Sequence, residues 1–154
     1  MDVRMHVINA KPPKADAFDT LVYTDIIDAG GGEGVLFIIQ TGATNGDSTP
    51  ILTVEASSTI GADALTAVPF VYRACVVDDT WGAWTAVLAT GVTINTTTAN
   101  SMWQVYVDSA EIAETGYRFV RLAIDEVVNL TQTAGVLALI INPRSAPQVG
   151  SLLD

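Results

Sequence analysis

The sequence predicts an all-β protein: an antiparallel β-sandwich, jelly-roll-like, with one short helix and an extended N-terminal arm. Short apolar runs rich in Val, Ile, Thr and aromatic residues recur along the 154-residue chain. Clusters of Gly, Asn, Asp, Ser and Pro separate these runs, which is the pattern of strands and turns. Almost no crossover helices can be found, so the strands must pair as antiparallel sheets that pack face to face or close into a barrel.

The strands are expected wherever an apolar run lies between two turn signals. These runs are residues 34–41, 50–56, 67–77, 83–88, 91–96, 102–107, 117–124 and 135–141, with a weaker candidate at 20–27. Three of them, 34–41, 67–77 and 135–141, are largely apolar on both sides. Each sheet of an isolated antiparallel sandwich should have one wet face. We therefore expect a neighbouring subunit or the chain's own arms to cover the outer side of these three strands.

The one predicted helix is the segment DSAEIAETG at residues 108–116. Asp108 is expected to accept a hydrogen bond from the N–H of Glu111 while the Glu111 side chain reaches back to the helix start. Gly116 supplies the left-handed residue that ends such a helix. The helix is about two turns long at most.

Three parts of the chain are predicted: an extended arm at 1–17, a β-sandwich domain at 18–144 and a C-terminal tail at 145–154. In the arm, Val3, Met5 and Val7 alternate with polar residues, and two prolines then impose an extended linker. One interpretation is a frayed terminus. The other is a docking arm that pairs with a partner's sheet edge and sets its cations against the partner's acids. The partner-binding residues would be Arg4, His6, Lys11, Pro12, Pro13 and Lys14.

The charge balance and the residue counts exclude several classes of function. Seven Lys+Arg against 17 Asp+Glu give a formal net charge of −10, which repels nucleic acid and anionic lipid. The single Cys75 and the single His6 exclude an intrachain disulfide and a Cys/His zinc site. We expect no catalytic residues, cofactor, metal site, nucleic-acid partner, secretory signal or membrane span. The acidic pairs Asp78–Asp79, Asp125–Glu126 and Asp25–Asp28 fit a calcium site or a glycoside hydrolase only weakly, and solvated loop acids are the preferred interpretation.

Tryptophans are the remaining candidate ligand residues. Trp81 and Trp84 lie in DTWGAWTAV and could form an aromatic platform for sugar rings. Aromatic residues at strand ends are more often core plugs or cross-strand partners, and that interpretation is preferred here too. Cys75, in the middle of an apolar run, is expected to be a small buried residue.

Four sequence segments, taken together, resemble a family of small virion proteins. VLFIIQTGA, AVPFVYRACVVDDTWGAWTAV, YVDSAEIAETGYRFVRLAIDEVVN and AGVLALIINPR, in this order, are similar to head decoration or cement proteins of tailed double-stranded DNA phages, over about residues 18–144. The resemblance implies a β-sandwich without enzymatic activity that binds the outer surface of the expanded capsid and bridges neighbouring major capsid proteins. It also implies a homo-oligomer, with a trimer preferred. A carbohydrate- or receptor-binding virion module and a tail or connector component are the alternatives.

Overall fold

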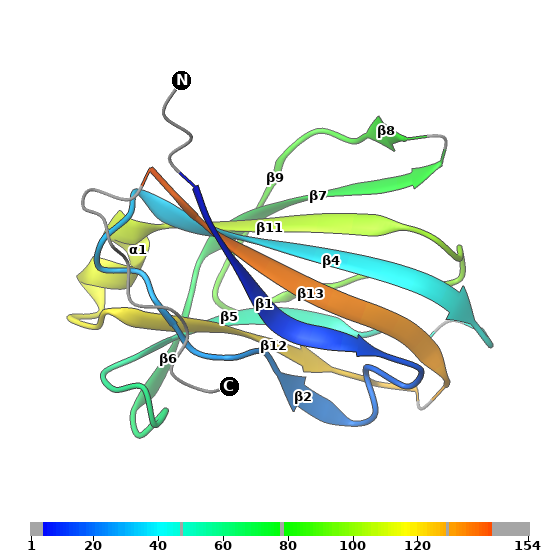
Figure 1. Ribbon diagram of the computed structural model, residues 1–154, viewed down its shortest axis with the longest axis horizontal. Helices are drawn as coiled ribbons and strands as arrows, with labels where there is room; N and C mark the ends of the chain where they lie inside the picture. The colour runs from blue at the N-terminus through cyan, green and yellow to red at the C-terminus, as the bar shows by residue number, and fades with distance from the viewer. Residues whose placement is uncertain (1–4, 47, 78, 129, 143–154) are drawn as a thin grey trace.

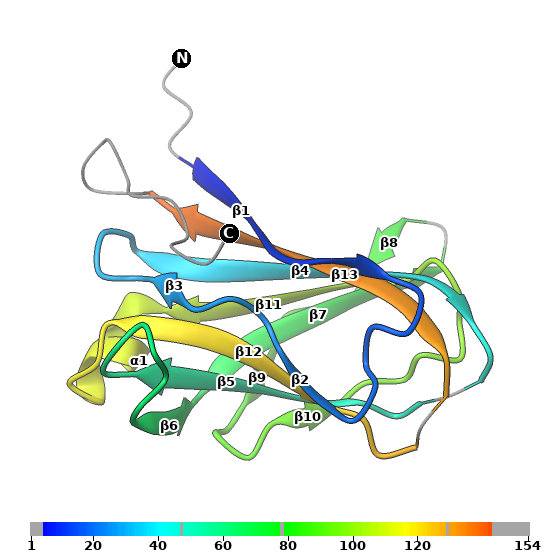
Figure 2. The same ribbon diagram turned by 60° about the horizontal axis from the view of Figure 1, so that its bottom comes forward.

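The computed structural model describes residues 5–46, 48–77, 79–128 and 130–142. Two antiparallel β-sheets, sheet A and sheet B, pack face to face (Figure 1). In Figure 2 the strands β1, β13 and β4 of sheet A lie above β12, β5 and β2 of sheet B. The antiparallel β-sandwich predicted from the sequence is therefore confirmed. No helix among the described residues is long and apolar enough to cross a membrane.

Sheet A has seven strands and sheet B has six. Sheet A follows the order β1–β13–β4–β11–β7–β8, with β9 also paired to β7, and consists of β1 (Met5–Lys14), β4 (Gly34–Thr44), β7 (Phe70–Val77), β8 (Thr80–Trp81), β9 (Thr85–Val87), β11 (Met102–Asp108) and β13 (Gln132–Ile141). Sheet B follows the order β10–β5–β12–β2, with β3 paired to β12 and β6 to β5, and consists of β2 (Leu21–Tyr23), β3 (Ile27–Asp28), β5 (Ile51–Ser57), β6 (Leu65–Val68), β10 (Val92–Thr93) and β12 (Phe119–Asp125).

The core lies between the two sheets and follows the two-residue period of the strands. Val35, Phe37 and Ile39 of β4 point inward and are completely buried. Val54 of β5 and Leu122 of β12 belong to the same core cluster from the opposite sheet. Because successive side chains of a strand point to opposite faces, the residues between them form the outer face of each sheet.

One expected strand is in fact two. The run 67–77 was predicted as a single strand, but β6 ends at Val68 and β7 begins at Phe70. β6 pairs with β5 in sheet B, whereas β7 pairs with β11 in sheet A. Pro69 lies between them and has no N–H to donate to a ladder, so the chain passes from one sheet to the other at this residue.

The predicted helix is present as α1 (Ser109–Glu114). The Asp108 carboxylate caps it, but it accepts from the N–H of Ala110 at 2.8 Å and not from that of Glu111. Gly116 has a φ of +78°, as expected for the residue that ends the helix. Ile112 is buried and anchors α1 to the core.

The N-terminal arm expected at residues 1–17 needs correction. Met5–Lys14 form the edge strand β1, which pairs with β13, and Ile8, Ala10 and Ala17 belong to the core cluster. The two prolines do not end the strand, because an edge strand needs only one of its sides for hydrogen bonds. The described part of the expected arm is therefore integral to the sandwich. Arg4 and the tail at 145–154 lie outside the described residues.

Candidate functional site

Sheet A turns a broad apolar surface away from the core. Val7, Leu139, Leu36, Tyr106 and Val71 lie in register in one row across β1, β13, β4, β11 and β7. We call the side chains on this surface the outer face. The neighbouring rows add the apolar residues Met5, Ile38, Met102, Leu137 and Ile141 and the polar residues Gln40, Gln104 and Arg73. Met5, Val7, Gln40 and Leu137 are exposed, and the other members are half-buried. This face explains why several strands are apolar on both of their sides. Among the described residues, no third sheet lies over it.

The same surface is nearly free of negative charge. The chain has 17 Asp+Glu, yet the seven strands of sheet A contain one acidic residue, Asp108, at the end of β11. The rest of the molecule therefore carries almost all of the acidic side chains. An acidic protein with one apolar side that has few acids can approach another protein surface there with little repulsion between carboxylates.

Sheet B presents a different outer surface. Arg121 of β12 donates from Nε to Glu55 Oε2 at 2.8 Å, and its guanidinium lies 3.6 Å from the centroid of the Tyr23 ring. Arg118 donates from Nε to Asp28 Oδ1 at 2.6 Å. Burial raises the pKa of Asp28, but the hydrogen bonds and the charge of Arg118 outweigh it, so that its pKa is lowered overall. Such paired charges are typical of a solvated face.

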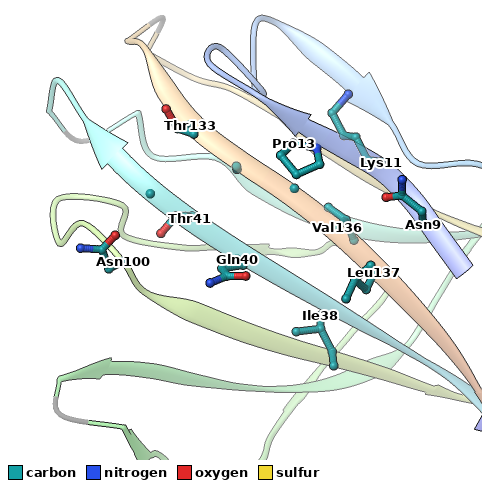
Figure 3. A pocket seen from close by; sticks show the side chains of 13 residues that line it. Asn9, Lys11, Pro13, Ile38, Gln40, Thr41, Asn100, Thr133, Val136 and Leu137 are labelled. Atoms are coloured by element: carbon teal, nitrogen blue, oxygen red, sulfur yellow. The ribbon is translucent and has the colours of Figure 1, made fainter. Parts of the chain in front are cut away.

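A groove of about 320 Å³ opens on the outer face where β1 ends (Figure 3). Asn9 and Pro13 of β1, Gln40 and Gly42 of β4, and Asn100 before β11 line it, together with the apolar side chains of Ile38, Val136 and Leu137. Its polar side chains are amides, hydroxyls and the Lys11 ammonium group. Such a groove can form hydrogen bonds with a polypeptide segment and hold it against an apolar wall.

The prolines of β1 shape this groove. The register between β1 and β13 shifts between Ile8 and Lys11 and again between Lys11 and Lys14, so the strand is irregular around Pro13. A Cβ added at Gly135 would lie 3.1 to 3.2 Å from atoms of Pro13. A side chain at residue 135 would therefore require Pro13 to shift by a few tenths of an ångström.

The structure describes five of the six residues predicted to bind a partner, and their environments differ. Lys11 and Pro13 line the groove, but in Figure 3 the Lys11 side chain extends past β1 on the side away from Gln40. Burial and the nearby Lys14 lower the pKa of Lys11, and Asp25 opposes them. Pro12 and Lys14 are exposed and His6 is half-buried. Arg4 is outside the described part of the chain. The groove and the outer face combine residues from distant strands, which no local motif could reveal.

The three tryptophans have different environments. Trp103 is buried in the core, as preferred, whereas Trp84 is 45% exposed and is not a core plug. Trp81 is half-buried and lies opposite Cys75 across the β7–β8 pair. The Arg73 guanidinium lies 4.8 Å from the Trp81 ring centroid and 4.6 Å from that of Trp84, so both rings have a cation–π partner. The predicted platform is thus partly occupied by an arginine that the sequence did not single out.

The acidic pairs behave differently from one another. Asp125 and Asp79 are exposed, as expected for solvated loop acids, and Asp78 lies outside the described residues. Glu126, however, is buried, which overturns that expectation for it. Cys75 is buried as predicted. Within the described ranges, no three His, Cys, Asp or Glu side chains gather as a metal cluster.

Comparisons with known proteins place the chain beside one solved structure. No family model matches the sequence, and no curated protein matches it. The fold is similar to the crystal structure of the SPBc2 prophage-derived protein YomS, with a TM-score of 0.48 and 13% sequence identity. The match covers 88% of this chain and 91% of that chain. This structural neighbour is thus a phage-derived protein.

Proposed function

We propose that the protein is a structural component of a tailed-phage virion that binds the outer surface of the capsid. There it stabilises the expanded head by bridging neighbouring major capsid proteins. The observation that carries this proposal is the outer face of sheet A, which is apolar and almost free of acids in a chain of net charge −10. The resemblance of the strand phrases to head decoration proteins supports the choice of partner.

The size of the outer face fits a contact with another protein. Five strands at a spacing of about 4.8 Å, over about six residues at 3.3 Å each, cover roughly 400 Å². An apolar patch of this size is often functional in a monomer, and it is about half of what one partner contributes to a standard interface. The groove beside Gln40 and Asn100 adds a polar rim, as protein interfaces have.

The magnitude of such a contact suits a repeated structural role. At about 25 cal/mol per Å², burying roughly 400 Å² contributes about 10 kcal/mol before the costs of association, which are of similar size. Each site is then of modest affinity. Many copies on one shell stabilise by mass action the lattice that they fit.

The distribution of charge supports a place on the outside of the shell. With sheet A against the capsid, the acidic remainder of the molecule faces solvent and lies away from the packaged DNA, whose phosphates would repel it. In this proposal the protein is not an enzyme and needs no cofactor. Self-association, with a trimer preferred, remains part of the proposal, since closed symmetry is usual for small oligomers.

Co-sedimentation with undecorated phage shells tests the proposal. The wild-type protein should sediment with expanded shells and not with immature ones. Leu137→Asp, at a side chain 43% exposed on the outer face, should weaken binding at least tenfold. Leu65→Asp, at a side chain 40% exposed on sheet B, is the matched control and should bind like the wild type. No binding of the wild type to either shell would contradict the proposal, and binding to isolated tails would favour the tail component.

A second candidate function rests on the exposure of Trp84. Its ring and the Trp81 ring both lie against the Arg73 guanidinium. Together they form an aromatic surface, which a carbohydrate- or receptor-binding module requires. A glycan array with the wild type and a Trp84→Ala variant tests it. Glycan binding that disappears in the variant, together with no binding to shells, would replace the capsid proposal by this one.

A further inference from the structure

Among the described residues, three buried side-chain oxygen atoms accept no hydrogen bond. They are Asp16 Oδ1, Glu126 Oε2 and Gln132 Oε1, each buried from solvent. Gln132 is 0% exposed as a residue and Glu126 is 9% exposed. Buried polar atoms nearly always have partners, so each exception calls for a water or an ion to explain it.

The three residues belong to two segments that lie against each other. The N–H of Ala17 donates to the carbonyl of Gln132 at 2.9 Å, and the N–H of Glu126 donates to the carbonyl of Thr20 at 3.1 Å. Residues 17 and 20 are therefore each hydrogen-bonded to one of the residues Gln132 and Glu126. Both segments are at the end of the sandwich where β1 ends and β13 begins (Figure 2).

Neighbouring bonds hold two of the side chains in place. Glu126 uses its other oxygen, Oε1, to accept from the N–H of Leu130 at 3.2 Å. The Gln132 amide nitrogen donates to the carbonyls of Ala43 at 3.3 Å and Thr133 at 3.2 Å. Exchanging the amide nitrogen and oxygen of Gln132 would set its oxygen against these two carbonyl oxygens. The orientation that leaves Gln132 Oε1 without a donor is therefore the favoured one.

The unpartnered set has the chemistry of a hard-cation site. Two of the three oxygens belong to carboxylates and the third to an amide, and these are the oxygen donors that Ca²⁺ binds together with backbone carbonyls and water. No ion pair among the described residues involves Asp16 or Glu126. A bound cation would supply the positive partner that these two carboxylates lack.

We propose that this end of the sandwich binds one divalent cation of the calcium type through Asp16, Glu126 and Gln132. The cation would fasten the segment after β1 to the loop between β12 and β13. With two carboxylates the site has a low ligand charge, and we expect a dissociation constant of about 10⁻⁴ M, as in weak calcium modules. The inference does not depend on the proposed capsid function, because it can be tested on the purified protein without shells.

Thermal unfolding of the full chain after treatment with EDTA and dialysis is the first test. Calcium chloride at about one hundred times the dissociation constant should raise Tm by roughly 5 to 10 °C over sodium chloride of equal ionic strength. Magnesium chloride should raise it less, because Mg²⁺ demands a stricter octahedral geometry. Equilibrium dialysis with calcium should find about one ion per chain. The absence of a calcium-dependent rise would overturn the inference and leave water as the partner of these oxygens.

Two variants with the same change of charge separate the site from the acidic surface. Glu126→Gln should abolish the calcium-dependent rise in Tm, whereas Asp125→Asn, at the exposed neighbouring acid, should keep it. An equal response of both variants would show nonspecific binding to the acidic surface and would overturn the inference. If Glu126→Gln does not fold, Asp16→Asn, at a half-buried side chain, makes the same comparison against Asp125→Asn.

Discussion

Two neighbouring residues of β1 can show whether this strand belongs to the sandwich. Ile8 is 8% exposed and packs in the core, whereas Val7 is 58% exposed on the outer face. Ile8→Ala removes three buried carbon groups at about 0.8 kcal/mol each and leaves part of a cavity, so we expect a loss of about 3 kcal/mol. For a chain of this length that is a fall in Tm of roughly 6 to 12 °C. Val7→Ala should change the free energy of unfolding by less than about 0.5 kcal/mol.

Urea unfolding monitored by tryptophan fluorescence is a suitable assay, since Trp103 is buried in the core. Both variants should keep the wild-type slope against urea, and only Ile8→Ala should shift the midpoint. Equal midpoints for the two variants would refute the reasoning. They would mean that Met5–Lys14 contribute nothing to the folded domain and form a free arm in solution.

Three further predictions concern backbone contacts and charge. Gly135→Ala should cost about 1 to 3 kcal/mol in urea unfolding, because the new methyl group presses on Pro13, and an unchanged midpoint would contradict the close approach. Asp108→Ala should cost about 1 kcal/mol by the same assay through loss of the α1 cap, and Asp108→Asn should restore most of it. The lowered pKa of Asp28 means that its bond with Arg118 stabilises the fold above the ordinary carboxyl pKa, and that this stability is lost as pH falls below about 4. Between about pH 6 and pH 3, the Tm of Asp28→Asn should therefore fall less steeply than the Tm of the wild type. An equal fall in Tm for both proteins would contradict this prediction.

The interior strands could be predicted because their apolar runs are long and bounded by turn residues. The run 102–107 became Met102–Asp108, and 117–124 became Phe119–Asp125. Edge strands were harder to predict, because their residues pack against fewer neighbouring strands. The prolines of β1 predict an extended linker, although an edge strand tolerates them on its unpaired side. At Pro69 the same residue type marks a change of sheet, a property of the tertiary structure that a local pattern does not contain.

The candidate site was predictable in kind but not in place. Strands apolar on both sides predict that a neighbouring subunit or the chain's own arms cover the outer face, where Leu36 and Leu139 lie. The described part of the N-terminal arm instead extends sheet A as β1, and cover by a neighbouring subunit stays a prediction. The groove joins Asn9, Gln40 and Asn100, which are brought together by strand order alone. The burial of Glu126 could not be predicted from the sequence either. Asp125 and Glu126 are adjacent acidic residues, and only Asp125 is exposed.

The position of β13 has a consequence for how the protein is made. This strand, the last described along the chain, lies inside sheet A between β4 and β1. During synthesis, β1 and β4 must wait for about one hundred later residues before β13 can pair with both of them. Such distant pairing slows folding, and until it happens the apolar edges of both strands are open to other chains. We therefore expect chains interrupted before residue 132 to aggregate, and sheet A to close only after β13 has left the ribosome.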